Sequence, residues 1–213
     1  MRACPDLLLD GSPSAQWTIA LAHGAGAPMD SPFINDLAAL LVREGLRVAR
    51  FEFPYMAARR GGTRRPPDRE PVLRQTWHAV VAHLLAEGTS ESRMAIGGKS
   101  MGGRIASMVA DELGVGALVC LGYPFHPPRQ PTRLRTAHLA GLRTRALIVQ
   151  GERDPFGTAA EVAAYPLSPA IEFLWLADGD HSLVPRRSSG HTGAAHLATA
   201  ARAIARFLLR ASG

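Results

Sequence analysis

The sequence predicts a doubly wound α/β fold in a chain of 213 residues. Short apolar runs of strand length alternate with longer stretches in which apolar residues recur at helical spacing. Several of the short runs are almost continuous in Val, Ile, Leu and Ala, which is typical of strands covered by helices on both faces. The pattern therefore favours a mostly parallel central sheet of about six to seven strands with helices on both sides.

The expected elements follow one another in regular order. A helix is expected to begin at Pro32, because proline suits the first helical position, and to stop at Gly45. Thr158 and Glu161 have capping-box spacing at the head of another short helix. Further helices are expected over 71–87, 101–113 and 192–209, and strands over 17–23, 46–53, 93–97, 116–121, 145–150 and 171–176.

Two irregular stretches, 54–70 and 123–135, interrupt this alternation. Each follows the carboxyl end of an expected strand, where ligands gather in open α/β sheets. We expect these stretches to form the walls of any pocket. The candidate substrate-binding residues within them are Tyr55, Phe125 and His126, for which packing of the loop is the alternative role.

Composition bounds the class of protein. With 46% hydrophobic and 20% charged residues the chain is typical of soluble globular proteins, and its length predicts one domain over 1–213. It has no apolar run of membrane-spanning length and no apolar leader at its start, so we expect a cytoplasmic location and no membrane partner. Its two cysteines, Cys4 and Cys120, lack disulfide-framework and metal-ligand spacing, and Cys120 is expected to be a buried, unreactive thiol.

The net charge of +6 raises the question of an anionic partner. Arginines are spread along the whole chain, which does not favour nucleic acid as a partner. A solvated surface loop is the favoured interpretation of the densest cluster, and steering of an anionic substrate remains the alternative. That cluster consists of Arg59, Arg60, Arg64, Arg65 and Arg69.

A GxSxG motif lies at 98–102, between an expected strand and an expected helix. Such a tight turn holds its central residue, here Ser100, at positive φ, and only glycine fits at Gly98 and Gly102 where the neighbouring backbones pass closely. The motif therefore marks Ser100 as a candidate nucleophile. Lys99, the single lysine beside 23 arginines, is expected to point away from the pocket with its ammonium group in solvent.

A serine nucleophile needs a base, and the base needs an acid that holds its tautomer. In one common arrangement these follow the serine in the order acid, then histidine. Asp154 and His181 come directly after two successive expected strands and match that order. Asp178 and Asp180 remain alternatives for the acid, and His126 for the base.

The remaining requirement is a site for the negative charge that develops on the substrate oxygen. The small-residue turn at 23–27 follows the first long strand and lets backbone amides approach a ligand closely. The amides of Ala25 and of Met101, at a helix start, are the candidate donors. His23 is expected to brace this turn.

Six phrases of the sequence carry a resemblance to a known family: LAHGAGAPMDSPF, RFEFPYM, GGKSMGGR, GYPFHPP, QGERDPFG and DGDHSL. From residue 17 onward the chain resembles the α/β-hydrolase superfamily, in the branch that includes the KANL3/Tex30 and dienelactone-hydrolase-like proteins. The resemblance implies an α/β-hydrolase fold whose opening strands are missing or reduced to about 7–9. It also implies Ser100 as nucleophile, His181 as base, Asp154 as acid, and Ala25 and Met101 as oxyanion donors.

Together these features predict a serine hydrolase that cleaves a small-molecule ester or thioester through an acyl-enzyme, like a carboxylesterase or thioesterase. Dienelactone hydrolases use cysteine where this chain has serine, which argues against their substrate. No metal or organic cofactor is implied, and the oligomeric state is not indicated.

Only about two dozen residues separate the strands at 116–121 and 145–150, so no large lid is expected. A non-catalytic binding or scaffold protein with the same fold is the alternative.

Overall fold

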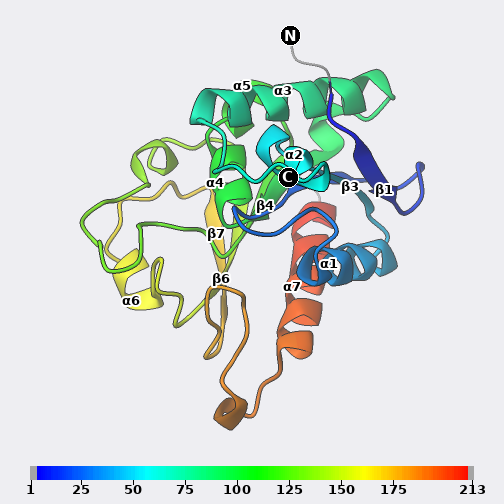
Figure 1. Ribbon diagram of the computed structural model, residues 1–213. Helices are drawn as coiled ribbons and strands as arrows, with labels where there is room; N and C mark the ends of the chain where they lie inside the picture. Colours follow the sequence, from blue (N-terminus) through cyan, green and yellow to red (C-terminus); the bar gives the residue numbers. More distant parts are fainter. Residues whose placement is uncertain (1–3, 211–213) are drawn as a thin grey trace.

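Seven strands form one sheet at the centre of the structure, a computed structural model that describes residues 4–210 (Figure 1). Their order across the sheet is β1-β3-β2-β4-β5-β6-β7. Strand β1 runs antiparallel to β3, and all other neighbouring pairs are parallel. The strands are β1 (Leu7–Asp10), β2 (Thr18–Ala22), β3 (Arg47–Phe51), β4 (Met94–Lys99), β5 (Ala117–Leu121), β6 (Ala146–Gly151) and β7 (Ile171–Leu176).

The central strands are apolar on both faces because both faces are covered. In β2, Ile19 and Leu21 belong to the core on one side of the sheet, whereas Ala20 and Ala22 belong to the core on the other. All four are fully buried. Side chains alternate between the two faces of a strand, so a continuous apolar run is what this position requires.

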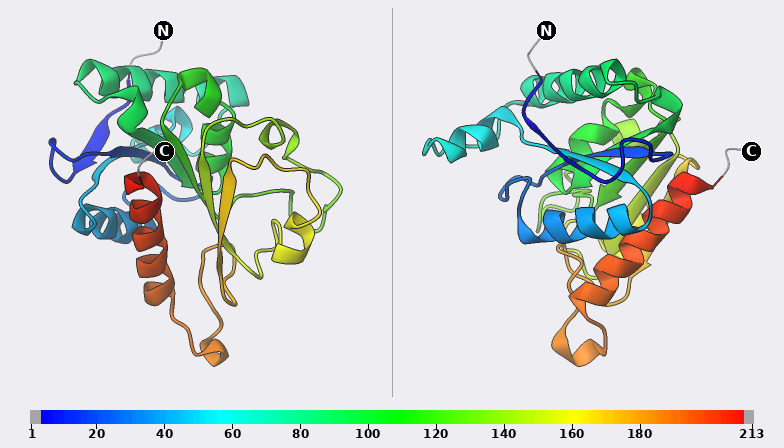
Figure 2. Two further views of the ribbon diagram at one scale, coloured as in Figure 1. Left: turned by 180° about the vertical axis from the view of Figure 1, so that it is seen from behind. Right: turned by 90° about the vertical axis from the view of Figure 1, so that its right-hand side faces the viewer.

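Helices cover the sheet in two layers (Figure 2). Helices α1 and α7 pack together on one face, and α3, α4 and α5 lie on the other. The helices are α1 (Pro32–Arg43), α2 (Pro54–Arg60), α3 (Glu70–Ala86), α4 (Met101–Ser107), α5 (Ala110–Leu113), α6 (Ala159–Val162) and α7 (Gly193–Leu209), with short 3-10 helices at η1 (Glu91–Arg93), η2 (Ala137–Leu139) and η3 (Arg187–Ser189).

Most expected elements are confirmed within one or two residues of their predicted ends, and the capping box of Thr158 and Glu161 is present at the head of α6. Cys120 is fully buried, as expected, and burial raises the pKa of its thiol. Residues 1–3 and 211–213, which the expected domain includes, lie outside the described part of the chain. Between residues 4 and 210, no helix combines the length and the apolar character needed to cross a membrane.

Two expectations about elements are wrong. The stretch 54–70 is not wholly irregular, because Pro54 starts α2, whose Tyr55 side chain is buried. The expected helix over 101–113 is split into α4 and α5, since bonds from the amides near its middle reach back only three residues and tighten the turn. The reduced opening strand expected at about 7–9 is confirmed as β1, and Asp10 at its end accepts a hydrogen bond from Arg50 Nε of β3 at 2.9 Å.

The segment between β5 and β6 confirms two other expectations. Residues 123–135 contain neither helix nor strand. Within the described chain, η2 is the single helical turn between these strands. Within residues 4–210, this segment therefore adds no helical lid over the edge at which the parallel strands end.

Trp77 of α3 anchors one face of the sheet and provides a test of the packing. Its side chain is fully buried and meets Phe51 of β3 edge to face at 4.7 Å between ring centroids. Trp77→Ala should lower the free energy of unfolding by about 3–5 kcal/mol, because it leaves a large cavity. Leu134→Ala, at an exposed position, should change it by less than about 0.5 kcal/mol. Urea unfolding followed by circular dichroism measures both, and equal effects would contradict this packing.

Candidate active site

Ser100 lies at the tip of the turn between β4 and α4, with φ 51° and ψ −115°. The turn packs directly on the end of β2. A Cβ on Gly98 would lie 2.1 Å from the carbonyl oxygen of Ala22, and one on Gly102 would lie 2.6 Å from it. No side chain fits at either position. The expected strained turn, with glycine two residues before and after the serine, is therefore confirmed.

Ser100 is joined to His181 and Asp154 by a chain of hydrogen bonds. Its Oγ lies 2.9 Å from His181 Nε2, and His181 Nδ1 lies 2.8 Å from Asp154 Oδ2. A carboxylate can only accept, so Nδ1 carries the proton and leaves Nε2 free to accept from the serine hydroxyl. These three side chains come from the ends of three different strands, β4, β6 and β7.

Asp154 is fully buried and is held by two further hydrogen bonds. Gln150 Nε2 donates to its Oδ2 at 2.8 Å, and the amide of Phe156 donates to its Oδ1 at 2.9 Å. The Phe156 ring also packs on the His181 ring, with centroids 4.2 Å apart. Sequence reasoning missed Gln150 and Phe156. The only signal was a polar residue ending an otherwise apolar strand run, and it does not say what that residue contacts.

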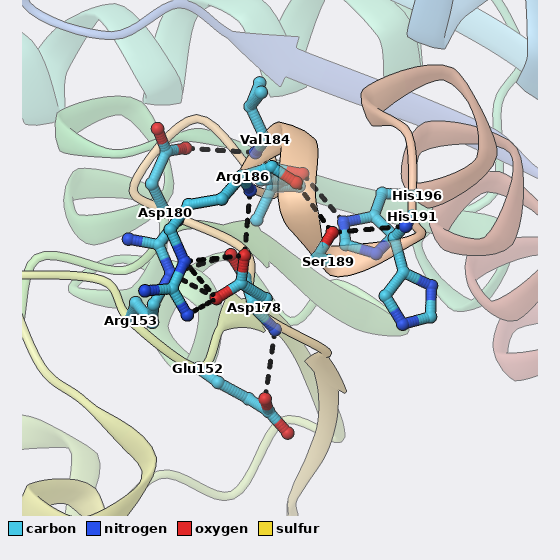
Figure 3. A network of polar contacts seen from close by, with 10 residues as sticks. Glu152, Arg153, Asp178, Asp180, Val184, Arg186, Ser189, His191 and His196 are labelled. Atoms are coloured by element: carbon cyan, nitrogen blue, oxygen red, sulfur yellow. Dashed lines mark hydrogen bonds and ion pairs between the residues drawn. The ribbon is translucent and has the colours of Figure 1, made fainter.

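The loop that carries His181 is braced by its own aspartates (Figure 3). Asp180 accepts hydrogen bonds from the amides of Ser182 and Val184, so it caps the turn around His181. Asp178 pairs with Arg186 and with Arg153, whose Nε lies 2.7 Å from it. The hydrogen bond from Arg186 is the main cause that lowers the pKa of Asp178 to about 2. Of the three aspartates left open by the sequence, Asp154 is the one hydrogen-bonded to His181.

Ala25, in the turn after β2, lines the same two cavities as Ser100. His23 Nδ1 donates to the Gly24 carbonyl at 2.6 Å, and Tyr55 Oη donates to the Ala25 carbonyl at 3.0 Å. The N–H of Ala25 belongs to the same trans peptide as the Gly24 carbonyl and points the opposite way. Neither this amide nor that of Met101 bonds to another residue of the described chain. His23, fully buried, braces the turn as expected, and burial lowers its pKa.

The three candidate substrate-binding residues do not line the cavities beside Ser100. Tyr55 is fully buried under the turn at 23–27, where its hydroxyl donates to the Ala25 carbonyl. Phe125 is fully buried against Tyr123. His126, the alternative base, is buried with its Nε2 3.6 Å from Glu161. All three expectations are corrected, because loop packing takes up these side chains.

Two cavities meet at Ser100, and both are lined by Ala25. The first, of about 410 Å³, is walled by both expected stretches, which contribute Pro67 and Asp68 from one and Pro124 and Arg135 from the other. The second, of about 470 Å³, is mainly apolar. Its lining residues include Phe33, Ile34, Lys99, His181 and Val184.

Lys99 faces the second cavity, which corrects the expectation that it points into solvent. A Cβ on Gly122 would lie 2.9 Å from Lys99 Nζ and 3.4 Å from His181 Nδ1, so the amine sits close to the site. Burial lowers the pKa of Lys99 to about 8, although the charges of Asp154 and Asp180 partly oppose the shift. The sequence offered only the rarity of lysine as a signal.

The arginine cluster at 59–69 is partly tied into the fold. Arg60 donates to Glu52 at 2.7 and 2.8 Å and pairs with Asp30 at 2.9 Å. Arg59 lies over the Tyr55 ring at 5.4 Å. No three His, Cys, Asp or Glu side chains within residues 4–210 come together in an arrangement that would hold a metal ion.

The buried amine of Lys99 predicts a dependence of stability on pH. In the unfolded chain the Lys99 amine keeps its proton up to about pH 10.5, whereas in the folded chain it loses this proton above about pH 8. Because the unfolded chain binds more protons between these two values, the free energy of unfolding rises with pH in this range. The charged amine therefore destabilises the fold below pH 8. Lys99→Met should be more stable than the wild type at pH 7, and this advantage should shrink by about 1–3 kcal/mol at pH 10.5. Urea unfolding of both proteins at the two pH values measures it, and a constant difference would contradict the prediction.

Solved structures of other proteins have the same fold as this chain. The chain is similar to a lidless α/β serine hydrolase from Xanthomonas campestris, with 18% identity, a TM-score of 0.68 and coverage of 98% of this chain and 91% of that one. It is similar to a putative α/β hydrolase from Agrobacterium tumefaciens at 14% identity, with a TM-score of 0.71 and coverage of 95% and 90%. A dienelactone hydrolase from Anabaena variabilis is similar at 19% identity, with a TM-score of 0.67 and coverage of 95% and 90%. These likenesses show the α/β-hydrolase fold. The model of the family described as alpha/beta hydrolase domain matches residues 15–209, and the chain belongs to that family.

Proposed function

We propose that this protein is a serine hydrolase that cleaves a carboxylic ester or thioester through an acyl-enzyme. The observation that carries the proposal is the hydrogen-bonded chain from Ser100 Oγ to His181 Nε2 at 2.9 Å and from His181 Nδ1 to Asp154 at 2.8 Å. The serine sits on a strained turn between two cavities, where a substrate carbonyl can reach it.

In the acylation step Ser100 Oγ attacks the substrate carbonyl while His181 Nε2 takes the hydroxyl proton. Asp154 stabilises the resulting imidazolium and keeps its orientation. The amides of Ala25 and Met101 donate to the oxyanion of the tetrahedral intermediate. When the intermediate collapses, the bond to the leaving group breaks and His181 returns the proton to that group.

In the deacylation step a water molecule gives a proton to His181 and attacks the acyl carbonyl. The ester bond to Ser100 then breaks, the acid is released, and the serine regains its proton from His181. Apart from this water, every group in the two steps that acts on the substrate is a side chain or an amide of this chain. The sequence phrases favour the KANL3/Tex30-like branch within the family, which we keep as a proposal together with a cytoplasmic location.

Covalent labelling tests the nucleophile. A fluorophosphonate probe should label the wild type at Ser100, and Ser100→Ala and His181→Ala should each abolish the label. Ser182→Ala is the matched control, since it removes another hydroxyl that lines the second cavity and should leave labelling intact. Mass spectrometry of the labelled peptide identifies the site. If the folded wild type stays unlabelled and binds nucleic acid with a steep salt dependence, the scaffold alternative replaces the enzyme.

Substitution of the three aspartates tests the acid. Asp154→Asn should lower kcat for a 4-nitrophenyl ester by roughly a thousandfold or more, because the amide favours the wrong histidine tautomer. Asp178→Asn and Asp180→Asn should each keep kcat within roughly tenfold, since these carboxylates brace the loop and do not contact the imidazole. A larger loss in either control than in Asp154→Asn would move the acid role to that residue.

A further inference from the structure

The two cavities that meet at Ser100 differ in their charged groups. The second cavity carries Lys99 among mainly apolar side chains. The first carries Arg104 and Arg135, together with Asp68 and Glu70. Arg104 and Arg135 are both partly buried, so a guanidinium group there that lacks a partner carries a desolvation cost.

Arg104 reaches the first cavity from α4, one helical turn after the serine. Its amide donates to the carbonyl of Ser100 at 3.0 Å. Its Nε is buried and has no hydrogen-bond partner among the described residues. Its terminal nitrogen lies 3.5 Å from Glu70, at the limit of a hydrogen bond. The guanidinium therefore has donor capacity that the described chain does not use.

Arg135 is presented to the same cavity by a backbone fixed on both sides. Its amide donates to the Phe125 carbonyl at 2.7 Å, and its own carbonyl accepts from Tyr123 Oη at 3.0 Å. No side chain of residues 4–210 forms an ion pair or hydrogen bond with its guanidinium. Desolvation, followed by repulsion from Arg104 and Arg133, lowers the pKa of Arg135. A bound anion would oppose the repulsion and would offset the desolvation by direct attraction.

The carboxylates of this cavity do not pair with Arg135. Asp68 accepts from the Tyr55 amide at 2.8 Å and lies 3.6 Å from Arg65. Glu70 is shared between Arg104 at 3.5 Å and Arg74 at 3.9 Å. Neither carboxylate pairs with Arg135, so within the described chain its guanidinium has no ion-pair partner, whereas Arg104 has only the 3.5 Å contact with Glu70.

We propose that Arg104 and Arg135 bind a carboxylate at the far end of the substrate's acyl group, so that the substrate is a monoester or monothioester of a short dicarboxylic acid. This inference rests on the proposed function. His181, which must protonate the leaving group, lines the second cavity, so the leaving group lies there and the acyl group lies in the first. Arg104 is one turn, roughly 6 Å, along the helix from Ser100, which suits an acyl chain of a few carbons.

Two paired esters test the charge. The acidic substrate is mono-4-nitrophenyl adipate, and the neutral one is its methyl ester of nearly the same shape. Wild type should show at least tenfold higher kcat/KM for the acidic ester. Arg135→Gln should lower kcat/KM at least tenfold for the acidic ester and less than threefold for the neutral one. Equal rates on both esters in the wild type, or equal losses on both in the variant, would overturn the inference.

A matched control separates a local subsite from the general positive charge of the chain. Arg133→Gln removes the same charge from the same loop, but Arg133 is exposed and does not line the cavity. It should leave the preference for the acidic ester within twofold of the wild type. If Arg133→Gln reduces the preference as much as Arg135→Gln does, long-range attraction explains it and the subsite is refuted.

The position of the carboxylate is tested with 4-acetoxybenzoate, which carries it on the leaving group. Preference over methyl 4-acetoxybenzoate that depends on Arg135 would overturn the acyl assignment. As a binding test, free adipate should slow fluorophosphonate labelling of the wild type but not of Arg135→Gln, and equal slowing of both would count against the subsite. Labelling of Ser100 and turnover of the neutral ester report the proposed function separately, so the two proposals fail distinguishably.

Discussion

The close contact between the β4–α4 turn and the end of β2 is the constraint on which the rest of the site depends. Gly98 and Gly102 let the backbone of this turn rest on the Ala22 carbonyl. The contact requires Ser100 to adopt a strained φ of 51°. This strain costs roughly 1–3 kcal/mol, which the surrounding hydrogen bonds must offset. Its amide donates to the Leu121 carbonyl at 2.9 Å, which ties the turn to β5 as well.

The register of the strands determines how the turn at 23–27 and the loop of His181 lie relative to that contact. Ala22 of β2 pairs with Gly98 of β4, so the residues that follow each strand emerge side by side. Gly151 of β6 pairs with Leu176 of β7, which brings the loops of Asp154 and His181 together. The His181 loop must then cross the end of β5, where a Cβ on Gly122 would lie 2.7 Å from the His181 carbonyl oxygen. Because Gly122 has no side chain, the loop can pass close enough there for His181 to reach Ser100.

The division of charge around the serine follows from the same topology. Helix α4 starts at the serine turn and carries Arg104 toward the segment after β5, which brings Arg135. The loop after β7 meets the turn at 23–27 on the other side, where Lys99 and the apolar side chains lie. Under the proposed function, a substrate bound across Ser100 would meet both guanidinium groups and two carboxylates at one end, and at the other a mainly apolar wall that includes Lys99.

The sequence by itself determined the alternation of strands and helices and the residues offered for the site. Those features follow from patterns among neighbouring residues: the periodic spacing of apolar residues, proline and glycine at helix ends, and the glycines around Ser100. Only the tertiary structure decided which aspartate meets His181, that Tyr55 and Phe125 pack inside, and that Lys99 and Arg135 face the cavities. These outcomes depend on strand order and on loops that cross one another, contacts between residues far apart in the chain that no local pattern records.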